Sequence, residues 1–138
     1  MVIRNCAGGV VFNGDDVLLI ENDKHEWAFP KGVVRPGNKM IDVALERIKI
    51  ECGVDASILV PCGKTHYEFY SVTRRKPVHN NVSWFIMKAS SKEVAPNSGE
   101  DILSAKFIPV TEALETVTYS QDRTLLMMAY QRYKEITA

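Results

Sequence analysis

The chain has 138 residues, of which 46% are hydrophobic and 25% charged, proportions that are ordinary for a soluble globular protein. Lysine plus arginine equals aspartate plus glutamate at 17 each, so no global charge attracts the chain to nucleic acid or a membrane surface, and nucleic acid is not an expected partner. No apolar run reaches the ~18 residues that a membrane span needs. The length fits one domain over residues 1–138.

The cysteines and the N-terminus bear on the cellular compartment. Cys6, Cys52 and Cys62 are an odd number without CxxC spacing, so we interpret them as reduced thiols and not as a disulfide framework or a zinc site. The first residues lack the layout of a signal peptide, because Arg4 and Asn5 interrupt the apolar run. We therefore expect a cytoplasmic protein without membrane contact.

The first third of the chain predicts strands. Two apolar runs separated by the turn signal Asn13-Gly14 indicate a hairpin. A short strand that Pro30 and Gly32 end is expected next, followed by a loop rich in turn residues. The predicted ranges are 6–12 and 17–22 for the hairpin strands, 26–32 for the short strand and 33–39 for the loop.

A helix is predicted from Met40 to Cys52, because the apolar period changes there to that of a helix. Gly53 follows, and glycine is the usual residue just past a helix end. The expected core-facing stripe consists of Ile41, Ala44, Leu45, Ile48 and Cys52.

The second half predicts more strands and two helices. Runs of β-branched and aromatic residues indicate strands, and polar runs indicate loops. Ser120 is the expected N-cap of a last helix that runs to about Glu135, with Leu125, Met128 and Ala129 as its core stripe. The order of elements favours a mixed α/β domain. The remaining predicted ranges are strands 56–72, 82–90 and 105–110, loops 74–81 and 91–101, and a helix over 111–117.

Residues 29–54, FPKGVVRPGNKMIDVALERIKIECGV, resemble the Nudix box, G-x5-E-x7-R-E-U-x-E-E-x-G-U with U a bulky apolar residue. The surroundings are similar to those of the small diadenosine polyphosphate hydrolases: AGGVVF precedes the box, W-x-x-PKG opens it at Trp27, and Y-x-F follows at Tyr67 and Phe69. The resemblance covers nearly the whole chain. It implies the Nudix fold, an α/β/α sandwich with a mixed β-sheet.

The box is matched at its structural positions but not at its acidic ones. Asn38 stands where the family has its first glutamate, Glu46-Arg47 reverses the family's Arg-Glu pair, and Ile50 replaces the next glutamate. We therefore interpret the box as degenerate. The matching residues are Gly32, Ile48, Glu51, Gly53 and Val54.

The departures concern the chemistry that the resemblance implies, which is Mg²⁺-dependent hydrolysis of a nucleoside diphosphate linked to another group. Mg²⁺ requires hard oxygen ligands, and a helix supplies them on one face at i, i+3 and i+4. Those positions carry Arg47, Ile50 and Glu51, which have no net charge and contain one carboxylate. A helical wheel at ~100° per residue places them away from the apolar stripe.

Three functions remain open from the sequence, and we favour the first. In the first, Arg47 replaces the metal as a built-in cation and pairs with Glu51. The chain then binds a nucleotide or dinucleoside polyphosphate without a cofactor, and its hydrolysis is weak or absent. In the second, the chain is an active Mg²⁺-dependent hydrolase, with Glu51 as metal ligand, Glu51 and Glu46 as catalytic candidates, and help from acids such as Glu100. In the third, it is a non-catalytic interaction module whose protein partner is unknown.

Further candidates for substrate binding lie outside the box. Lys31 is a candidate for a phosphate, although a solvated lysine fits the pattern equally well. Tyr67 is a candidate for stacking on a base, although core packing is the favoured role for most of the aromatic residues of this strand. Lys76 belongs to a basic run that resembles a polyphosphate clamp or a solvated hairpin tip. Asn80 aligns with a position where the related branch often has a lysine.

Overall fold

The computed structural model describes residues 1–138, and its centre is a seven-stranded mixed sheet. β1 pairs antiparallel with β2 and parallel with β6, and β6 pairs antiparallel with β5. The order is β3-β2-β1-β6-β5, with β4 on β1 and β7 on β2. The strands are β1 (Val2–Asn13), β2 (Asp16–Asn22), β3 (Trp27–Ala28), β4 (Lys31–Val33), β5 (Ala56–Ser71), β6 (Lys76–Ala89) and β7 (Ile102–Pro109).

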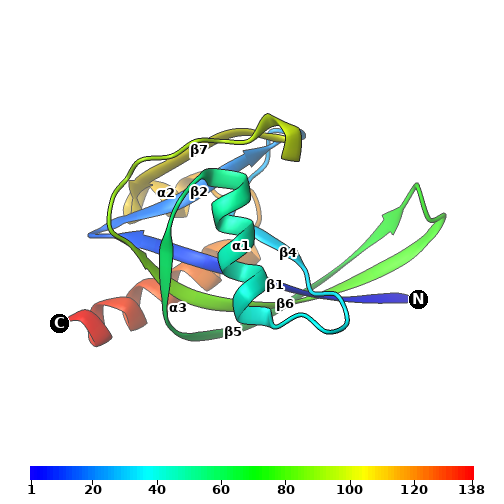
Figure 1. Ribbon diagram of the computed structural model, residues 1–138, viewed down its shortest axis with the longest axis horizontal. Helices are drawn as coiled ribbons and strands as arrows, with labels where there is room; N and C mark the ends of the chain where they lie inside the picture. Colours follow the sequence, from blue (N-terminus) through cyan, green and yellow to red (C-terminus); the bar gives the residue numbers. More distant parts are fainter.

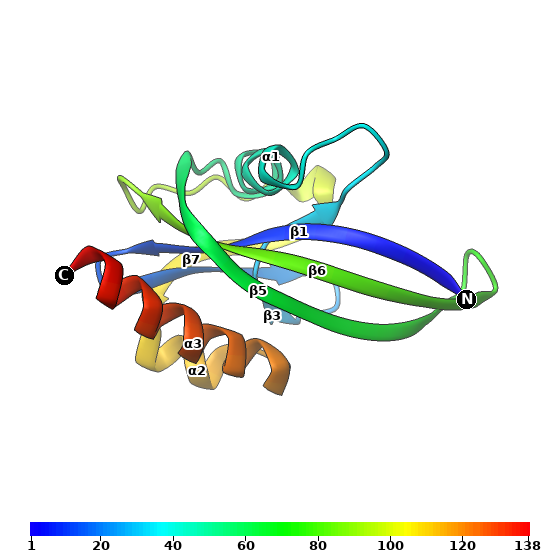
Figure 2. The same ribbon diagram turned by 90° about the horizontal axis from the view of Figure 1, so that it is seen from below.

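Helices cover both faces of this sheet. α1 (Met40–Cys52) lies on one face, and α2 (Val110–Thr116) and α3 (Ser120–Thr137) lie on the other (Figures 1 and 2). Each interface has its own apolar core. β1 contributes to both, because alternate side chains of a strand point to opposite faces: Ala7 and Val11 face α1, whereas Val10 and Phe12 face α2 and α3. The predicted α/β/α sandwich with a mixed sheet is confirmed.

β1 and β6 are longer than the sequence predicts. The predicted loop 74–81 is wrong from residue 76 onward, because Lys76 begins β6. The residues from Val78 pair with β5 on one side and with the start of β1 on the other, so backbone pairing outweighs their polar composition. Together these strand ends form an arm that projects beyond the helices (Figure 1).

The predicted strand over 26–32 is divided into β3 and β4, with Phe29 and Pro30 between them. Pro30 has no backbone N–H for a ladder, but its carbonyl accepts a hydrogen bond from Gly9 N at 3.2 Å. A Cβ on Gly8 would lie 2.5 Å from the same carbonyl oxygen, so only glycine allows β1 and this segment to approach so closely. This approach fixes the start of β4 against the sheet.

α1 has the predicted bounds, and Gly53 ends it in the left-handed conformation at φ 70° with its N–H on Lys49 O. Its buried face differs from the prediction, however. Ile41 is 48% exposed, and Val43 is buried in its place. The predicted stripe holds for Ala44, Ile48 and Cys52, while Leu45 is partly buried against the same core.

α3 begins one residue earlier than predicted. Tyr119 occupies the N-cap position without a capping side-chain hydrogen bond, and Ser120 is the first helical residue. Met128 is 54% exposed, so its assignment to the core stripe is wrong, and Leu126 is buried beside Leu125 and Ala129 instead. No helix has the length and apolar character of a membrane span.

Candidate functional site

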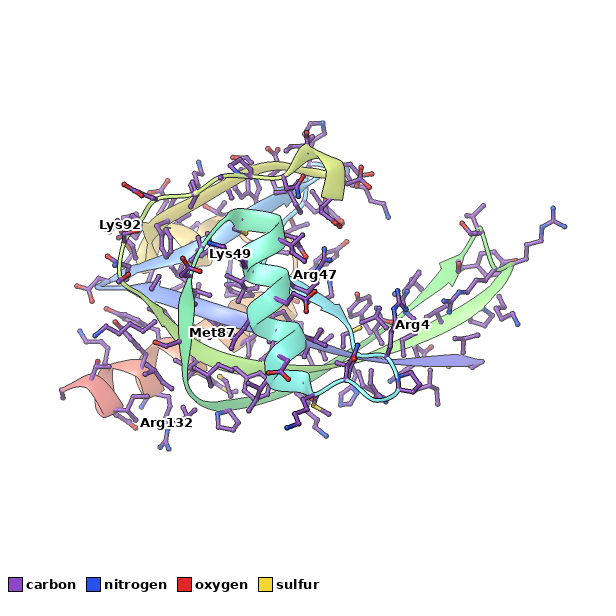
Figure 3. All side chains as sticks on the ribbon, in the orientation of Figure 1. Arg4, Arg47, Lys49, Met87, Lys92 and Arg132 are labelled. Carbon is purple, nitrogen blue, oxygen red and sulfur yellow. The ribbon has the colours of Figure 1, made fainter.

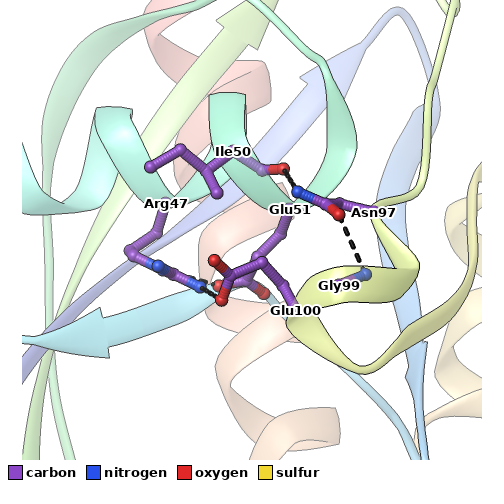
Figure 4. Close-up of polar contacts among 6 residues, drawn as sticks. All are labelled: Arg47, Ile50, Glu51, Asn97, Gly99 and Glu100. Atoms are coloured by element: carbon purple, nitrogen blue, oxygen red, sulfur yellow. Dashed lines mark hydrogen bonds and ion pairs between the residues drawn. The ribbon is translucent and has the colours of Figure 1, made fainter.

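Arg47 is held between two carboxylates at the C-terminal half of α1 (Figure 4). Its Nε donates to Oε2 of Glu51 at 2.9 Å, and its Nη2 donates to Oε2 of Glu100 at 3.0 Å. The predicted pairing of Arg47 with Glu51 is therefore present. Arg47 and Lys49 leave α1 on opposite sides (Figure 3). Only Arg47 faces the cluster of carboxylates.

The helical wheel places Glu51 away from the apolar stripe, yet Glu51 is only 4% exposed. The reason is the segment before β7, which docks on the end of α1. Asn97 N donates to Glu51 O at 3.0 Å, Ala95 N donates to Cys52 O at 2.6 Å, and the Asn97 side chain donates to Ile50 O at 3.2 Å. The segment brings Glu100 to Arg47 and covers Glu51, while Ile50 remains partly exposed.

Gly32 of β4 provides room for the Arg47 side chain. A Cβ at residue 32 would lie 2.4 Å from Cγ and 2.6 Å from Cδ of Arg47. The guanidinium therefore approaches Glu51 across the backbone of β4. This contact explains in physical terms why a glycine stands at residue 32, the first position of the box.

Burial disfavours the charged forms of both Glu51 and Arg47. Desolvation raises the pKa of Glu51, and the nearby charges of Arg47 and Lys31 lower it only in part. Partial burial disfavours the charge of Arg47, but the hydrogen bonds and charges of Glu100 and Glu51 outweigh it and raise the Arg47 pKa. Arg47 thus stays cationic and stabilises the ionised form of Glu51.

The residues of α1 do not by themselves fit a Mg²⁺ site. Of the three face positions only Glu51 carries an oxygen ligand, and one of its oxygens already accepts from Arg47. No group of three or more His, Cys, Asp and Glu side chains in residues 1–138 is placed to hold a metal ion. A metal that requires octahedral oxygen ligands would need ligands that a substrate brings.

A cavity of about 400 Å³ lies between α1 on one side and β4 with the loop that follows it on the other. Its lining is cationic, because Lys31, Arg35 and Arg47 stand against the single carboxylate of Glu46. Arg47 is paired with Glu51 and Glu100, but Lys31 and Arg35 alone still outnumber Glu46. The structure thus brings three predicted residues, Lys31, Glu46 and Arg47, to one cavity. Asn38 also lines it.

A second cavity, of about 520 Å³, lies on the α3 side of the sheet and is walled by aromatic rings. Trp84 is fixed there by its Nε1, which donates to Thr65 Oγ1 at 2.8 Å. The ring centroids of Tyr67 and Phe69 are 6.0 Å apart, as expected for residues on one strand face. We call this the aromatic cavity; the aromatic residues that line it are Phe29, Tyr67, Phe69, Trp84 and Tyr119.

Lys31 lines both cavities. Its Nζ lies 5.5 Å from the ring centroid of Tyr67. The Tyr67 hydroxyl accepts from Asn80 Nδ2 at 2.7 Å, and Asn80 Oδ1 accepts from Arg4 Nε at 2.9 Å. Asn80 is therefore a buried bridge that holds Tyr67 in position. Lys76, by contrast, lies at the exposed start of β6 and lines neither cavity.

Several residues of the aromatic cavity escaped the sequence analysis. Glu26 accepts hydrogen bonds from Asn22 Nδ2 at 3.0 Å and from the Tyr119 hydroxyl. Asp122 also lines the cavity, and burial raises its pKa against the charge of Lys31. The spacing of Asp122 from Leu125, Leu126 and Ala129 places it on the core-facing side of α3, which was a signal that could have identified it.

A family model described as the NUDIX domain matches residues 2–128. The chain therefore belongs to the Nudix family. Solved structures share its fold: an Ap4A hydrolase from C. elegans superposes with a TM-score of 0.71 at 18% identity, over 96% of this chain and 98% of that one. A Nudix hydrolase from Nitrosomonas europaea gives a TM-score of 0.73 at 14% identity, over 96% of this chain and 74% of that one.

Sequence relatives are distant. The chain is 26% identical over 139 residues to the protein named MutT4 of Mycobacterium tuberculosis, which covers 93% of this chain and 55% of that protein. It thus spans about half the length of that relative. It is 24% identical over 143 residues to the asymmetrical bis(5'-nucleosyl)-tetraphosphatase of Rattus norvegicus, covering 95% of each.

Proposed function

We propose that the protein binds a nucleotide or dinucleoside polyphosphate and hydrolyses it weakly or not at all. The observation that carries this proposal is the position of Arg47, whose guanidinium contacts Glu51 and Glu100 where the family's box has a glutamate. The degenerate box then has a structural meaning, because a fixed cation occupies the place of a metal ligand. Guanidinium binds phosphate oxygens well, so the same group can serve a polyphosphate.

We expect different parts of the ligand to bind in the two cavities. Phosphates are expected in the cationic cavity, close to Arg47, Arg35 and Lys31. A base is expected in the aromatic cavity, where Tyr67 is a candidate for stacking. The names of the relatives support this class of ligand, since the rat protein is a bis(5'-nucleosyl)-tetraphosphatase and the C. elegans protein an Ap4A hydrolase. Lys76 remains a candidate only for a ligand that extends along the arm.

The convergence of Glu51 and Glu100 favours one alternative, an active Mg²⁺-dependent hydrolase. Both carboxylates lie within 3.0 Å of the Arg47 guanidinium, so they would offer neighbouring oxygens if Arg47 swung away. A substrate that carried Mg²⁺ on its phosphates could recruit them. Glu46 is exposed and lines the cationic cavity, where its predicted catalytic role can be tested.

Calorimetric titration of Mg²⁺ into the ligand-free protein tests the proposal. Arg47 neutralises the carboxylates that would attract a divalent cation, so no saturable site is expected at low millimolar concentration. Turnover of diadenosine tetraphosphate with Mg²⁺ should also stay far below the ~1–10³ s⁻¹ of ordinary enzymes. A tight Mg²⁺ site together with turnover in that range would establish the alternative instead.

A further inference from the structure

Asp122 is the carboxylate in the aromatic cavity that has no partner. Its side chain makes no hydrogen bond or ion pair; burial and the more distant charge of Lys31 are what act on it. The two other carboxylates that line the cavity are engaged, Glu26 by Asn22 and Tyr119 and Glu68 by His79. Asp122 is only partly buried and its oxygens keep contact with solvent, so they are free to accept hydrogen bonds from a ligand.

The position of Asp122 is unusual for its residue type. It lies one turn before Leu125 and Leu126, which are buried on the sheet-facing side of α3. An apolar side chain at residue 122 would extend this packing, and the carboxylate of Asp122 instead lines the aromatic cavity. An ionised carboxylate accepts hydrogen bonds and cannot donate them. The cavity thus combines flat apolar walls with an acceptor-only edge.

We infer that the aromatic cavity holds a guanine-type base, whose adjacent ring N–H and exocyclic amino group donate to the carboxylate of Asp122. This inference rests on the proposed nucleotide-binding function and adds the identity of the base. Guanine presents N1–H and the N2 amino group side by side, so both oxygens of a carboxylate accept at once. Adenine presents one amino group beside the acceptor N1, which would face a carboxylate oxygen without a proton between them.

The first turn of α3 offers backbone N–H donors for O6, the remaining polar atom on this edge of guanine. Ser120 and Gln121 line the same cavity, and Tyr119 at the N-cap provides no side-chain hydrogen bond. The first N–H groups of a helix have no acceptor within the helix. Asp122 N and Arg123 N donate to Tyr119 O, which leaves the N–H groups of Ser120 and Gln121 for the O6 carbonyl of guanine. The amino group at this position of adenine would oppose them.

The test is calorimetric binding of GTP, ITP and ATP to the natural protein in the presence of a chelator. GTP should bind about tenfold more tightly than ATP, the scale of one charge-assisted hydrogen bond, and ITP, which lacks the 2-amino group, should lie between them. Equal affinities for GTP and ATP would overturn the assignment of the base and leave the proposed function standing. If none of the three binds, the assignment of the base is overturned, and the titration of diadenosine tetraphosphate decides whether the proposed function stands.

Asp122→Asn provides a second arm, because an amide offers one acceptor and one donor, the complement of the adenine edge. The ratio of GTP to ATP affinity should fall by at least about tenfold. Glu112→Gln is the matched control, since Glu112 is an exposed acid in the first turn of α2, and its ratio should not change. An unchanged ratio in Asp122→Asn would contradict the inference; if that variant does not fold, the comparison of GTP with ITP in the natural protein decides.

Discussion

Replacing four residues should convert the protein into a Mg²⁺-dependent hydrolase of diadenosine tetraphosphate. Arg47→Glu and Ile50→Glu add two carboxylates beside Glu51, and Glu46→Arg and Asn38→Glu complete the family's box. When bound, Mg²⁺ neutralises phosphate charge and lowers the pKa of the attacking water. We expect turnover to rise on the order of 10²–10⁴-fold over the natural sequence, the scale of a positioned catalytic group.

The structure indicates how the fold would tolerate this change. None of the four residues belongs to the buried face of α1, although the stem of Arg47 packs over Gly32. Removing Arg47 places the carboxylate of residue 47 near those of Glu51 and Glu100, so the rebuilt protein should lose stability without metal and regain it with Mg²⁺.

The assay is chromatographic separation of nucleotide products with and without Mg²⁺. Adding Glu51→Gln to the rebuilt protein is the control and should abolish the gain. A rebuilt protein that folds and binds Mg²⁺ but cleaves nothing would show that the cavities have diverged as well, with Asn80 the next residue to change. Turnover by the natural sequence at the rebuilt rate would refute a degraded metal site.

Arg47→Ala should destabilise the protein by about 2–3 kcal/mol at neutral pH. Glu51 has a side chain that is only 6% exposed, and removal of its partner leaves a buried carboxylate uncompensated. The expected loss is below the largest values for buried pairs because the Arg47 side chain is 26% exposed. Urea denaturation of both proteins at several pH values measures the difference.

The loss should depend on pH with a definite sign. The folded-state pKa of Glu51 lies above its ordinary value of 4.5, and it should rise further in Arg47→Ala because the main opposing charge is gone. A raised carboxyl pKa gives stability that is complete below the unfolded value and is lost as pH rises through the folded value. The gap between the two proteins should therefore be largest at neutral pH and shrink toward pH 4.5.

Two variants separate charge from packing. Arg47→Met keeps an apolar stem over Gly32, so it should regain the part of the stability that comes from packing. Because it also lacks the charge, its remaining loss should vary with pH as that of Arg47→Ala does. Lys49→Ala, on the opposite side of α1, removes an exposed ion pair with Asp55 and should cost at most about 0.5 kcal/mol. A gap for Arg47→Ala that is constant with pH would contradict the role assigned to the buried carboxylate.

The sequence predicts the fold well where local and global signals agree. The period of residues 40–52 and Gly53 define α1, and the alternation at Tyr67 and Phe69 places both rings on one face. It fails at residues 76–81, whose polar composition indicates a loop, because two neighbouring strands supply the backbone partners. Such long-range pairing leaves no local pattern.

In the candidate site, too, local contacts are predictable from the sequence and long-range ones are not. The spacing of Arg47 and Glu51 predicts their contact, since residues four apart meet on a helix. The burial of Glu51 was not predictable, because it depends on Asn97 and its neighbours docking on the helix end from a distant part of the chain. Asp122 had a signal in its spacing from Leu126, but the aromatic cavity it faces is assembled from segments far apart in sequence.

The central claim is that Arg47 takes the place of the metal in binding polyphosphate. Calorimetric titration of diadenosine tetraphosphate into the natural protein and Arg47→Ala, each with chelator and with Mg²⁺, tests it most directly. We expect the natural protein to bind equally well with chelator and with Mg²⁺, and Arg47→Ala to lose about 1–3 kcal/mol of binding free energy. Binding that requires Mg²⁺, or that is as tight in Arg47→Ala, would contradict this account.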